Sequence, residues 1–353
     1  MSKPETKQVD VPSNQQTILI KTSPAGGFGF GAKLLLTFLF LSIMVNVIFY
    51  SKYKEYFSLA ETPPEKYYSG DKGTNNKIAV IKMSGTIMPP FTKRLIESIE
   101  HATKDDNVKG VLLVVNSPGG FVADSHQIYH RLQELREKKP VYVSMESLAA
   151  SGGYYIAMGA GPEARIFAEP TTWTGSIGVI IPRYNFSKLA EKIGVSSEPL
   201  KTGEFKDSLN PFRDLSENDK KLWGDIMEDS FSRFRKVISD NRSNLTPEQV
   251  KELATGQIYT ANQALKNGLI DEIGFEEDAL KALKEKITEK TSISTFRVIT
   301  YVHQPGLIEL VTGSVKAQEP QQQFSALMEM TVPRAMYYSS WLPVTPPMIG
   351  KAD

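Results

Sequence analysis

Residues 110–120 read Gly-Val-Leu-Leu-Val-Val-Asn-Ser-Pro-Gly-Gly, an apolar run that ends in a glycine turn. A run that is apolar at every position predicts a β-strand covered on both faces, as strands in parallel sheets are. The glycines let the backbone turn sharply and can present N–H groups to an anion. The turn is therefore either an ordinary strand-to-helix connection or half of an oxyanion hole.

Short β-branched runs alternate with helical periodicity on both sides of this stretch. Residues 77–83 and 141–145 predict two further strands. Residues 92–102 and 124–138 repeat apolar side chains at helical spacing, and residues 215–289 look mainly helical. Strands separated by helices indicate βαβ units, so we expect an α/β domain with a mostly parallel sheet.

Residues 148–156, Leu-Ala-Ala-Ser-Gly-Gly-Tyr-Tyr-Ile, place Ser151 between small residues and two glycines. Such a setting exposes a hydroxyl at a strand-to-helix turn and leaves backbone N–H groups beside it. A serine nucleophile needs that access, and the oxyanion it generates needs those donors. Most serines in such a setting are structural, and Ala149 stands where the α/β-hydrolase elbow requires glycine. The motif alone leaves the role of Ser151 open.

A general base for this serine is hard to find among the histidines. The chain has four, His101, His126, His130 and His303, and none lies between Ser151 and His303. His126 and His130 have the i, i+4 spacing of a metal pair, but no His-Glu-x-x-His pattern completes it. We expect histidines on a solvated helix face there and no metal or cofactor site.

Lysine is the remaining candidate base. A lysine near its ordinary pKa of about 10.4 is protonated at neutral pH, and burial in an apolar pocket can lower that pKa by several units. Residues 201–207, Lys-Thr-Gly-Glu-Phe-Lys-Asp, form the notable lysine-bearing loop after the serine. Residue chemistry alone does not choose between Lys201 and Lys206, and most lysines are surface charges.

Composition excludes several classes of protein. The 353 residues carry a net charge of +1, which gives no indication of nucleic-acid binding. The chain has no cysteine, which excludes disulfides, thiolate zinc sites and a cysteine nucleophile.

The N-terminal region predicts a membrane anchor. Residues 34–50 are uncharged and apolar, so we expect a transmembrane helix over residues 33–51. No small-x-small cleavage site follows, which argues against a removed signal peptide. Residues 1–32 are predicted to be a disordered tail and residues 52–76 a polar linker. Lysines flank the helix on both sides, so charge does not decide its orientation.

Residues 77 to about 290 resemble the signal peptide peptidase A family, serine peptidase family S49, on the ClpP/crotonase-type fold. The resemblance rests on five motifs in the family's order. These are NSPGG at 116–120, SLAASGGYYIA at 147–157, TTWTGSIGVI at 171–180, KTGEFKD at 201–207 and GQIYTANQALKNGLIDEIG at 256–274.

The resemblance assigns roles by position. It implies that Ser151 is the nucleophile, Lys206 the general base and Ser176 the residue that orients the lysine amine. It also implies that an oxyanion is held by backbone N–H groups of Gly119, Gly120 and Gly152. Lys201 comes too early in the loop to match the base.

The resemblance further implies a membrane-anchored serine endopeptidase with a Ser-Lys dyad. Its substrates would be remnant signal peptides and other hydrophobic peptides at the lipid bilayer, cut after small residues. The catalytic domain would be extracytoplasmic on a bacterial cell membrane. The chain would form a homo-oligomeric ring of about eight, with sites shared between subunits.

Two alternatives come from other classes. The crotonase-type fold also holds CoA-dependent enzymes, and some relatives of these peptidases are inactive membrane scaffolds. The intact Ser151, Ser176 and Lys206 favour the peptidase.

The C-terminal region, residues 291–353, matches the family poorly and reads as an extended or partly disordered extension. Its apolar stretches at 324–330 and 335–341 suggest a segment that docks in the substrate groove, although an ordinary peripheral element is the simpler interpretation.

Overall fold

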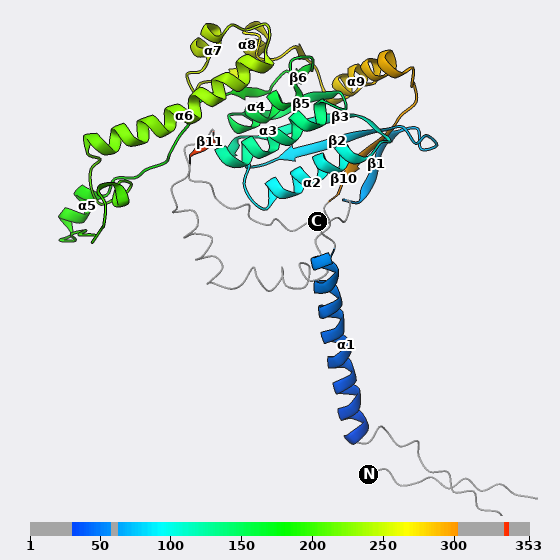
Figure 1. The fold of residues 1–353 in the computed structure, drawn as a ribbon, viewed down its shortest axis with the longest axis horizontal. Helices are drawn as coiled ribbons and strands as arrows, with labels where there is room; N and C mark the ends of the chain where they lie inside the picture. Colours follow the sequence, from blue (N-terminus) through cyan, green and yellow to red (C-terminus); the bar gives the residue numbers. More distant parts are fainter. Residues whose placement is uncertain (1–29, 58–62, 303–334, 339–353) are drawn as a thin grey trace, which may run out of the picture. The chain divides into compact units, whose positions relative to one another are not determined.

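The computed structural model describes residues 30–57, 63–302 and 335–338 (Figure 1). They fall into two units. One contains helix α1, Phe30–Phe57, and the other contains the sheet and its helices.

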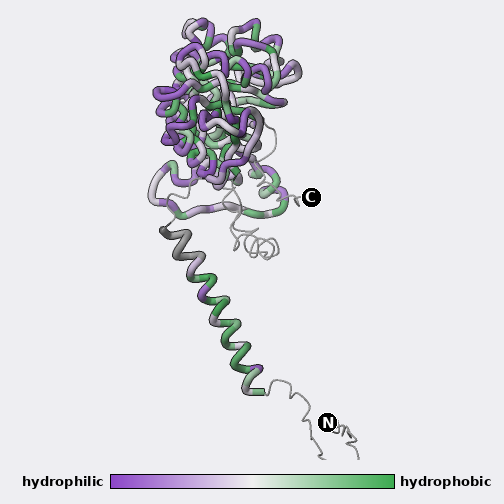
Figure 2. Tube along the Cα trace, turned by 90° about the vertical axis from the view of Figure 1, so that its right-hand side faces the viewer, coloured by the Kyte–Doolittle hydropathy of each residue, from purple (hydrophilic) through white to green (hydrophobic). Residues whose placement is uncertain are grey.

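Helix α1 is 28 residues long, which corresponds to about 42 Å at 1.5 Å per residue. Its segment Phe30–Tyr50 is apolar and exposed, and it is long enough to cross a membrane. Figure 2 shows this run as a mostly hydrophobic stretch of the tube. The side chains of Thr37 and Asn46 donate to backbone carbonyls four residues earlier, so these two donors are satisfied within the helix. The expected span over residues 33–51 thus lies within one longer helix.

A nine-stranded sheet forms the centre of the second unit, with the order β1-β10-β2-β3-β5-β6-β9 and β7 and β8 attached through β5. All pairs are parallel except β1 with β10 and β7 with β8. The predicted mostly parallel sheet is therefore confirmed. The strands are β1 Glu65–Gly70, β2 Lys77–Ser84, β3 Val108–Ser117, β5 Val141–Ala150, β6 Ile166–Ala168, β7 Trp173–Gly175, β8 Ile258–Thr260, β9 Glu272–Ile273 and β10 Arg297–Tyr301.

Helices cover both faces of the central strand β3. A side chain at Gly110 would meet Ile287 of helix α9, and one at Gly153 of helix α4 would meet Val115. Because successive side chains of a strand point to opposite faces, α9 and α4 lie on opposite sides of the sheet. The helices are α2 Phe91–Lys104, α3 Val122–Arg136, α4 Gly152–Ala157, α5 Ser187–Lys192, α6 Glu217–Asn241, α7 Pro247–Leu253, α8 Ala261–Lys266 and α9 Glu276–Thr291, with 3₁₀ turns η1 Met158–Ala160 and η2 Glu204–Asp207.

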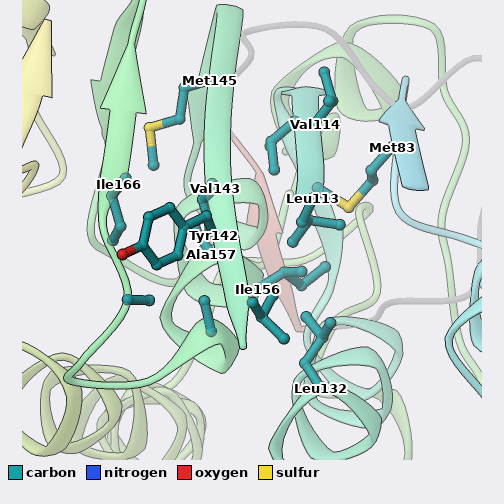
Figure 3. Packing of buried hydrophobic residues seen from close by; sticks show 14 of the residues in the cluster. Met83, Leu113, Val114, Leu132, Tyr142, Val143, Met145, Ile156, Ala157 and Ile166 are labelled. Atoms are coloured by element: carbon teal, nitrogen blue, oxygen red, sulfur yellow. The ribbon is translucent and has the colours of Figure 1, made fainter. Parts of the chain in front are cut away.

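The hydrophobic core lies where β3 is covered on both sides. Each residue from Val111 to Val115 is at most 1% exposed, as the apolar run predicted. Leu113 of β3, Ile156 of α4 and Leu132 of α3 are completely buried, and Figure 3 shows them side by side. This core fixes the carboxyl ends of β3 and β5, where the candidate site lies.

Three strands lie outside the predicted peptidase domain of residues 77–290. Strand β1 falls in the predicted linker, yet it pairs with β10, and β10 pairs with β2. The sheet therefore begins in the segment expected to be a linker and includes residues of the expected C-terminal extension. Within that extension, strand β11, Met336–Tyr338, pairs with strand β4, Gly119–Phe121, in a separate two-stranded sheet.

Candidate active site

Ser151 stands between the end of β5 and the first residue of α4. Its φ of +55° and ψ of −114° are strained for a residue with a side chain, at a cost of about 1–3 kcal/mol. Two backbone bonds hold it there. Its N–H donates to the carbonyl of Gly175 at 2.7 Å, and its own carbonyl accepts from the N–H of Tyr155 at 2.9 Å. The sequence thus forms the sharp strand-to-helix turn that was expected around this serine.

Parallel register brings three serines to one edge of the sheet. Ser117 at the end of β3 pairs with Ala149 of β5, and Ala150 of β5 pairs with Gly175 of β7. Ser151 directly follows Ala150 and Ser176 directly follows Gly175, so the two serines are adjacent. Ser176 has a φ of +49°, is 8% exposed, and donates its N–H to the carbonyl of Gln257 at 2.7 Å. The structure therefore places Ser176 beside Ser151.

The glycine turn lies against the start of α4. Gly119 has a φ of +100°, and a Cβ there would lie 2.7 Å from the nitrogen of Gly152. A Cβ on Gly152 would in turn lie 3.1 Å from the Cα of Gly119. Only residues without side chains fit this contact. The predicted oxyanion residues are thus brought together, with the Gly152 amide in the first turn of α4, where N–H groups are free for an anion.

The amides of the two turn glycines differ in their partners. The N–H of Gly119 donates to the hydroxyl of Ser117 at 3.1 Å, so this group is already engaged. Gly120 pairs with Tyr337 of β11 on one side and with Ile87 on the other. Its amide is the better candidate for a donor to a bound peptide carbonyl, together with that of Gly152. Sequence analysis missed Ser117, although its place in the NSPGG motif was the available signal.

Lys206 lies in η2, and its side chain is exposed. It belongs to residues 183–214, which we call the arm and which contain α5 and η2. The arm is attached to the first half of α6, because Arg213 donates to Asp219 at 2.6 Å and Trp223 donates to Ser208 at 3.0 Å. Figure 1 shows α5 at the far end of α6, away from the strands.

Phe234, in the second half of α6, is the part of that helix that reaches the candidate site. Its ring packs against Tyr155 of α4 with centroids 5.1 Å apart. Phe234 follows Trp223 by eleven residues, or about 16 Å of helix. Within one chain the structure therefore brings Ser151, Ser176, Gly119, Gly120 and Gly152 together, but it does not bring Lys206 to them.

Asp207, next to Lys206, anchors the arm electrostatically. Hydrogen bonds from Lys201 and Arg213 lower the pKa of Asp207. The hydrogen bond from Arg213, together with the hydrogen bonds with Ser216, lowers the pKa of Asp219. These bonds outweigh burial, which acts to raise that pKa. Lys201 forms an ion pair with Asp207 at 2.6 Å, which is a structural role. Lys206 is the lysine of this loop that does not take part in that ion pair.

His126 and His130 have the surroundings of structural residues. His126 Nδ1 lies 2.7 Å from the hydroxyl of Tyr155, and burial is the main reason that the pKa of His126 is lowered. His130 is exposed beside Glu134. His303 lies outside the described residues.

One acidic cluster has the spacing of metal ligands. Glu65, His101 and Asp105 bring their ligand atoms within 4.8 Å of one another. The ammonium of Lys77 lies 2.8 Å from Glu65 and 3.0 Å from Asp105, and so supplies the positive charge that a metal would bring. This cluster is an ion-pair network at the edge of the sheet.

Comparison with known proteins points to one class of enzyme. The profile of peptidase family S49 matches residues 133–290, and that of Clp protease matches residues 73–176. A protein of Enterococcus faecium, provisionally named signal peptide peptidase SppA, is 39% identical over 234 residues, 62% of this chain and 67% of the relative. A provisionally named protease of Synechocystis is 40% identical over 206 residues, 58% of this chain and 73% of the relative. The chloroplastic serine protease SPPA of Arabidopsis thaliana is 33% identical over 234 residues, 63% of this chain and 34% of the relative.

Proposed function

The chain belongs to peptidase family S49, and we propose that it is a membrane-anchored serine endopeptidase that cleaves remnant signal peptides and other hydrophobic peptides. One observation carries the proposal. The strained Ser151 lies at the start of a helix whose first amide, that of Gly152, touches the glycine turn at Gly119. A hydroxyl beside converging backbone amides is the arrangement that acyl transfer requires.

Ser151 is the proposed nucleophile, and the amides of Gly120 and Gly152 are the proposed oxyanion donors. Negative charge develops on the carbonyl oxygen when the serine oxygen adds to a peptide bond. Fixed backbone N–H groups stabilise that charge without reorganising, and loss of one such donor typically costs about 10²–10³ in rate. Gly119 contributes through its lack of a side chain, because its own N–H donates to the hydroxyl of Ser117.

Lys206 is the proposed base, and we propose that a second copy of the chain delivers it. The arm carries the exposed large apolar side chains expected of a surface that meets another protein. They are Tyr184, Phe186, Leu189, Ile193, Val195, Leu200, Phe205 and Phe212. A lysine becomes an effective base when burial disfavours its ammonium form, and packing of the arm against a neighbouring copy would supply that burial. A homo-oligomeric ring satisfies this requirement for every subunit.

The proposed reaction has two halves. Neutral Lys206 takes the proton of Ser151 as its oxygen bonds to the peptide carbonyl carbon, and the resulting ammonium then protonates the departing amine. Water, deprotonated by the same lysine, next attacks the acyl-enzyme and releases Ser151. Ser176 would hold the lysine amine in place, since it lies beside Ser151 at the sheet edge.

Helix α1 is the proposed single-pass anchor. It places the enzyme at the lipid bilayer, where hydrophobic signal-peptide remnants stay after their release. We propose the extracytoplasmic face of a bacterial cell membrane for the catalytic unit.

Labelling with a fluorophosphonate tests the proposal. The probe should bind covalently to Ser151 of the intact protein in detergent, and labelling should vanish in Ser151→Ala and fall at least about 100-fold in Lys206→Ala. A CoA-dependent enzyme or an inactive scaffold has no activated serine. Folded wild-type protein that remains unlabelled would refute the peptidase assignment.

A further inference from the structure

Ile87 lies in the segment that connects β2 to α2, outside all five motifs that carry the family resemblance. The segment is fixed to the sheet where it leaves β2, because the N–H of Gly85 donates to the carbonyl of Asn116 at 2.9 Å. Connecting segments normally run over the surface, yet Ile87 is completely buried. Its burial comes from contacts with both of the proposed oxyanion donors.

The backbone of Ile87 brackets Gly120. Its N–H donates to the carbonyl of Gly119, and its carbonyl accepts from the N–H of Phe121, each at 2.9 Å. Both bonds of this parallel bridge thus go to the neighbours of Gly120. Backbone groups of successive residues in an extended chain point to opposite sides, so the N–H of Gly120 points away from Ile87. A Cβ on Gly120 would lie only 2.1 Å from the Ile87 oxygen, so the two backbones are in direct contact. Ile87 therefore sets the direction of the proposed donor at Gly120.

The side chain of Ile87 reaches the second proposed donor. A Cβ on Gly152 would lie 3.0 Å from the δ-methyl carbon of Ile87, so this methyl group lies against the first residue of α4. Ser125 of α3 forms the opposite wall, because its Oγ would lie 2.7 Å from the same Cβ. That hydroxyl is held by its hydrogen bond to the carbonyl of Phe121 at 2.8 Å. Close packing of this kind leaves the Gly152 amide little room to shift.

From these contacts we infer that Ile87 is a positioning residue of the oxyanion site: its backbone directs the amide of Gly120, and its δ-methyl group holds the amide of Gly152 in place. The inference rests on the proposed function and adds to it a residue that acts through the two donors. The donors follow different strands, β3 and β5, and one residue from a third segment contacts both. Oxyanion stabilisation requires donors that are fixed before the charge develops, so the spacing of the two amides affects the rate.

Ile87→Val tests the side-chain contact, because it removes the δ-methyl group and leaves the backbone bonds in place. The assay uses the full-length protein in detergent and a fluorogenic Ala-Leu-Ala coumarylamide. The value of kcat should fall about tenfold, less than for loss of a whole donor, while KM stays within about twofold.

Ile287→Val is the matched control. Ile287 of α9 is also almost completely buried, and its δ-methyl carbon likewise lies against a glycine, 2.7 Å from where a Cβ on Gly110 would be. Gly110 lies near the start of β3, whereas the candidate site lies at the end of that strand. The control therefore removes the same methyl group from the core and should change neither kcat nor KM.

A peptide aldehyde separates an effect on the oxyanion from a general loss of structure. When the oxygen of Ser151 bonds to the aldehyde carbon of Ala-Leu-Ala-aldehyde, the serine proton passes to the base and the former carbonyl oxygen carries the negative charge. The inhibition constant of the aldehyde should therefore rise in Ile87→Val by the factor by which kcat/KM falls. The rate of fluorophosphonate labelling of Ser151, which needs no peptide, should fall by the same factor.

Each contrary result has its own meaning. Unchanged kcat and labelling rate in Ile87→Val, or an equal loss in Ile287→Val, would overturn the inference. A lower kcat with an unchanged inhibition constant would also overturn it, because the lost contact would then act elsewhere than on the oxyanion. Folded wild-type protein that cuts no peptide and leaves Ser151 unlabelled would instead refute the proposed function.

Discussion

The backbone N–H of Ser151 donates to the carbonyl oxygen of Gly175 at 2.7 Å, and both residues have positive φ angles, +55° and +82°. The position of the serine is therefore set by strand β7 as well as by the turn that contains it. Ser176 follows Gly175 directly and also has a positive φ. A change at Gly175 should disturb the proposed nucleophile and its neighbour together.

Gly175→Ala should lower kcat by about 100-fold, since displacements near 1 Å at reacting groups have effects of that size. The added Cβ would lie 2.5 Å from the ring of Tyr259, on a backbone that disfavours side chains. Gly224→Ala is the matched control, because a Cβ in that helix position has open space and improves helix propensity. Steady-state peptidase kinetics check both variants, and a fully active Gly175→Ala enzyme would contradict this role of β7.

Arg213→Ala should lower kcat at least about tenfold when kcat is measured well below the melting temperature. It should also lower the melting temperature, because it leaves the buried carboxylate of Asp219 without its partner. Arg213 joins Asp207, the neighbour of Lys206, to Asp219 of α6. Without it the arm loses one of its attachments to α6 and keeps the one between Trp223 and Ser208, while the core of β3 and α4 keeps its contacts. Parallel calorimetry and kinetics separate the two effects. Normal turnover in Arg213→Ala would show that the arm does not position the base.

Arg242→Ala should lower the free energy of unfolding by about 3 kcal/mol, because it leaves a charge without its partner. Arg242 is 5% exposed, donates twice to Asp271 at 2.8–2.9 Å, and also donates to the carbonyl of Gly268. Arg131→Ala, which breaks a more exposed pair with Glu134, should cost less than about 1 kcal/mol. Denaturant unfolding measures both values, and equal costs would contradict the burial argument.

His126 should make stability depend on pH. Burial, with Arg233 and His130 nearby, lowers the pKa of His126 below its ordinary 6.5. The unfolded chain therefore binds the proton first as pH falls, so the stabilising contribution is complete above about pH 6.5 and is lost below it. The melting temperature of wild type should fall more between pH 7 and pH 5 than that of His126→Gln. If the melting temperatures of the two proteins fall equally between pH 7 and pH 5, His126 is not the source of the pH dependence.

The strands and turns that were predictable are those whose residues carry the signal locally. The apolar run at 110–116 predicted a strand buried on both faces, and the glycines beside Ser151 predicted a tight turn. Strand β1 gave no such signal, because Glu65–Gly70 is polar and mostly exposed at the edge of the sheet. Its pairing with β10 depends on residues more than 200 positions away.

The apolar stretch at 335–341 suggested a segment that docks in the substrate groove, but nothing in the sequence predicted strand β11 or its register with β4. Three residues do not form a strand by themselves, and Met336–Tyr338 is held by β4, by Ile180 and by the rings of Tyr155 and Phe234, which pack on Tyr337. The candidate site shows the same difference between what local sequence predicts and what depends on distant residues. The register of β5 and β7 brings Ser151 and Ser176 to one edge, whereas the dyad that we propose with Lys206 requires contacts between copies of the chain.

Complementation between inactive variants tests the central claim most directly. Ser151→Ala and Lys206→Ala are each expected to be inactive as pure proteins. Co-expressed and purified as mixed oligomers, they should regain a substantial fraction of wild-type peptidase activity, because some sites would join an intact Ser151 from one copy to an intact Lys206 from another. Mixed oligomers that stay as inactive as either variant alone would contradict a dyad shared between subunits.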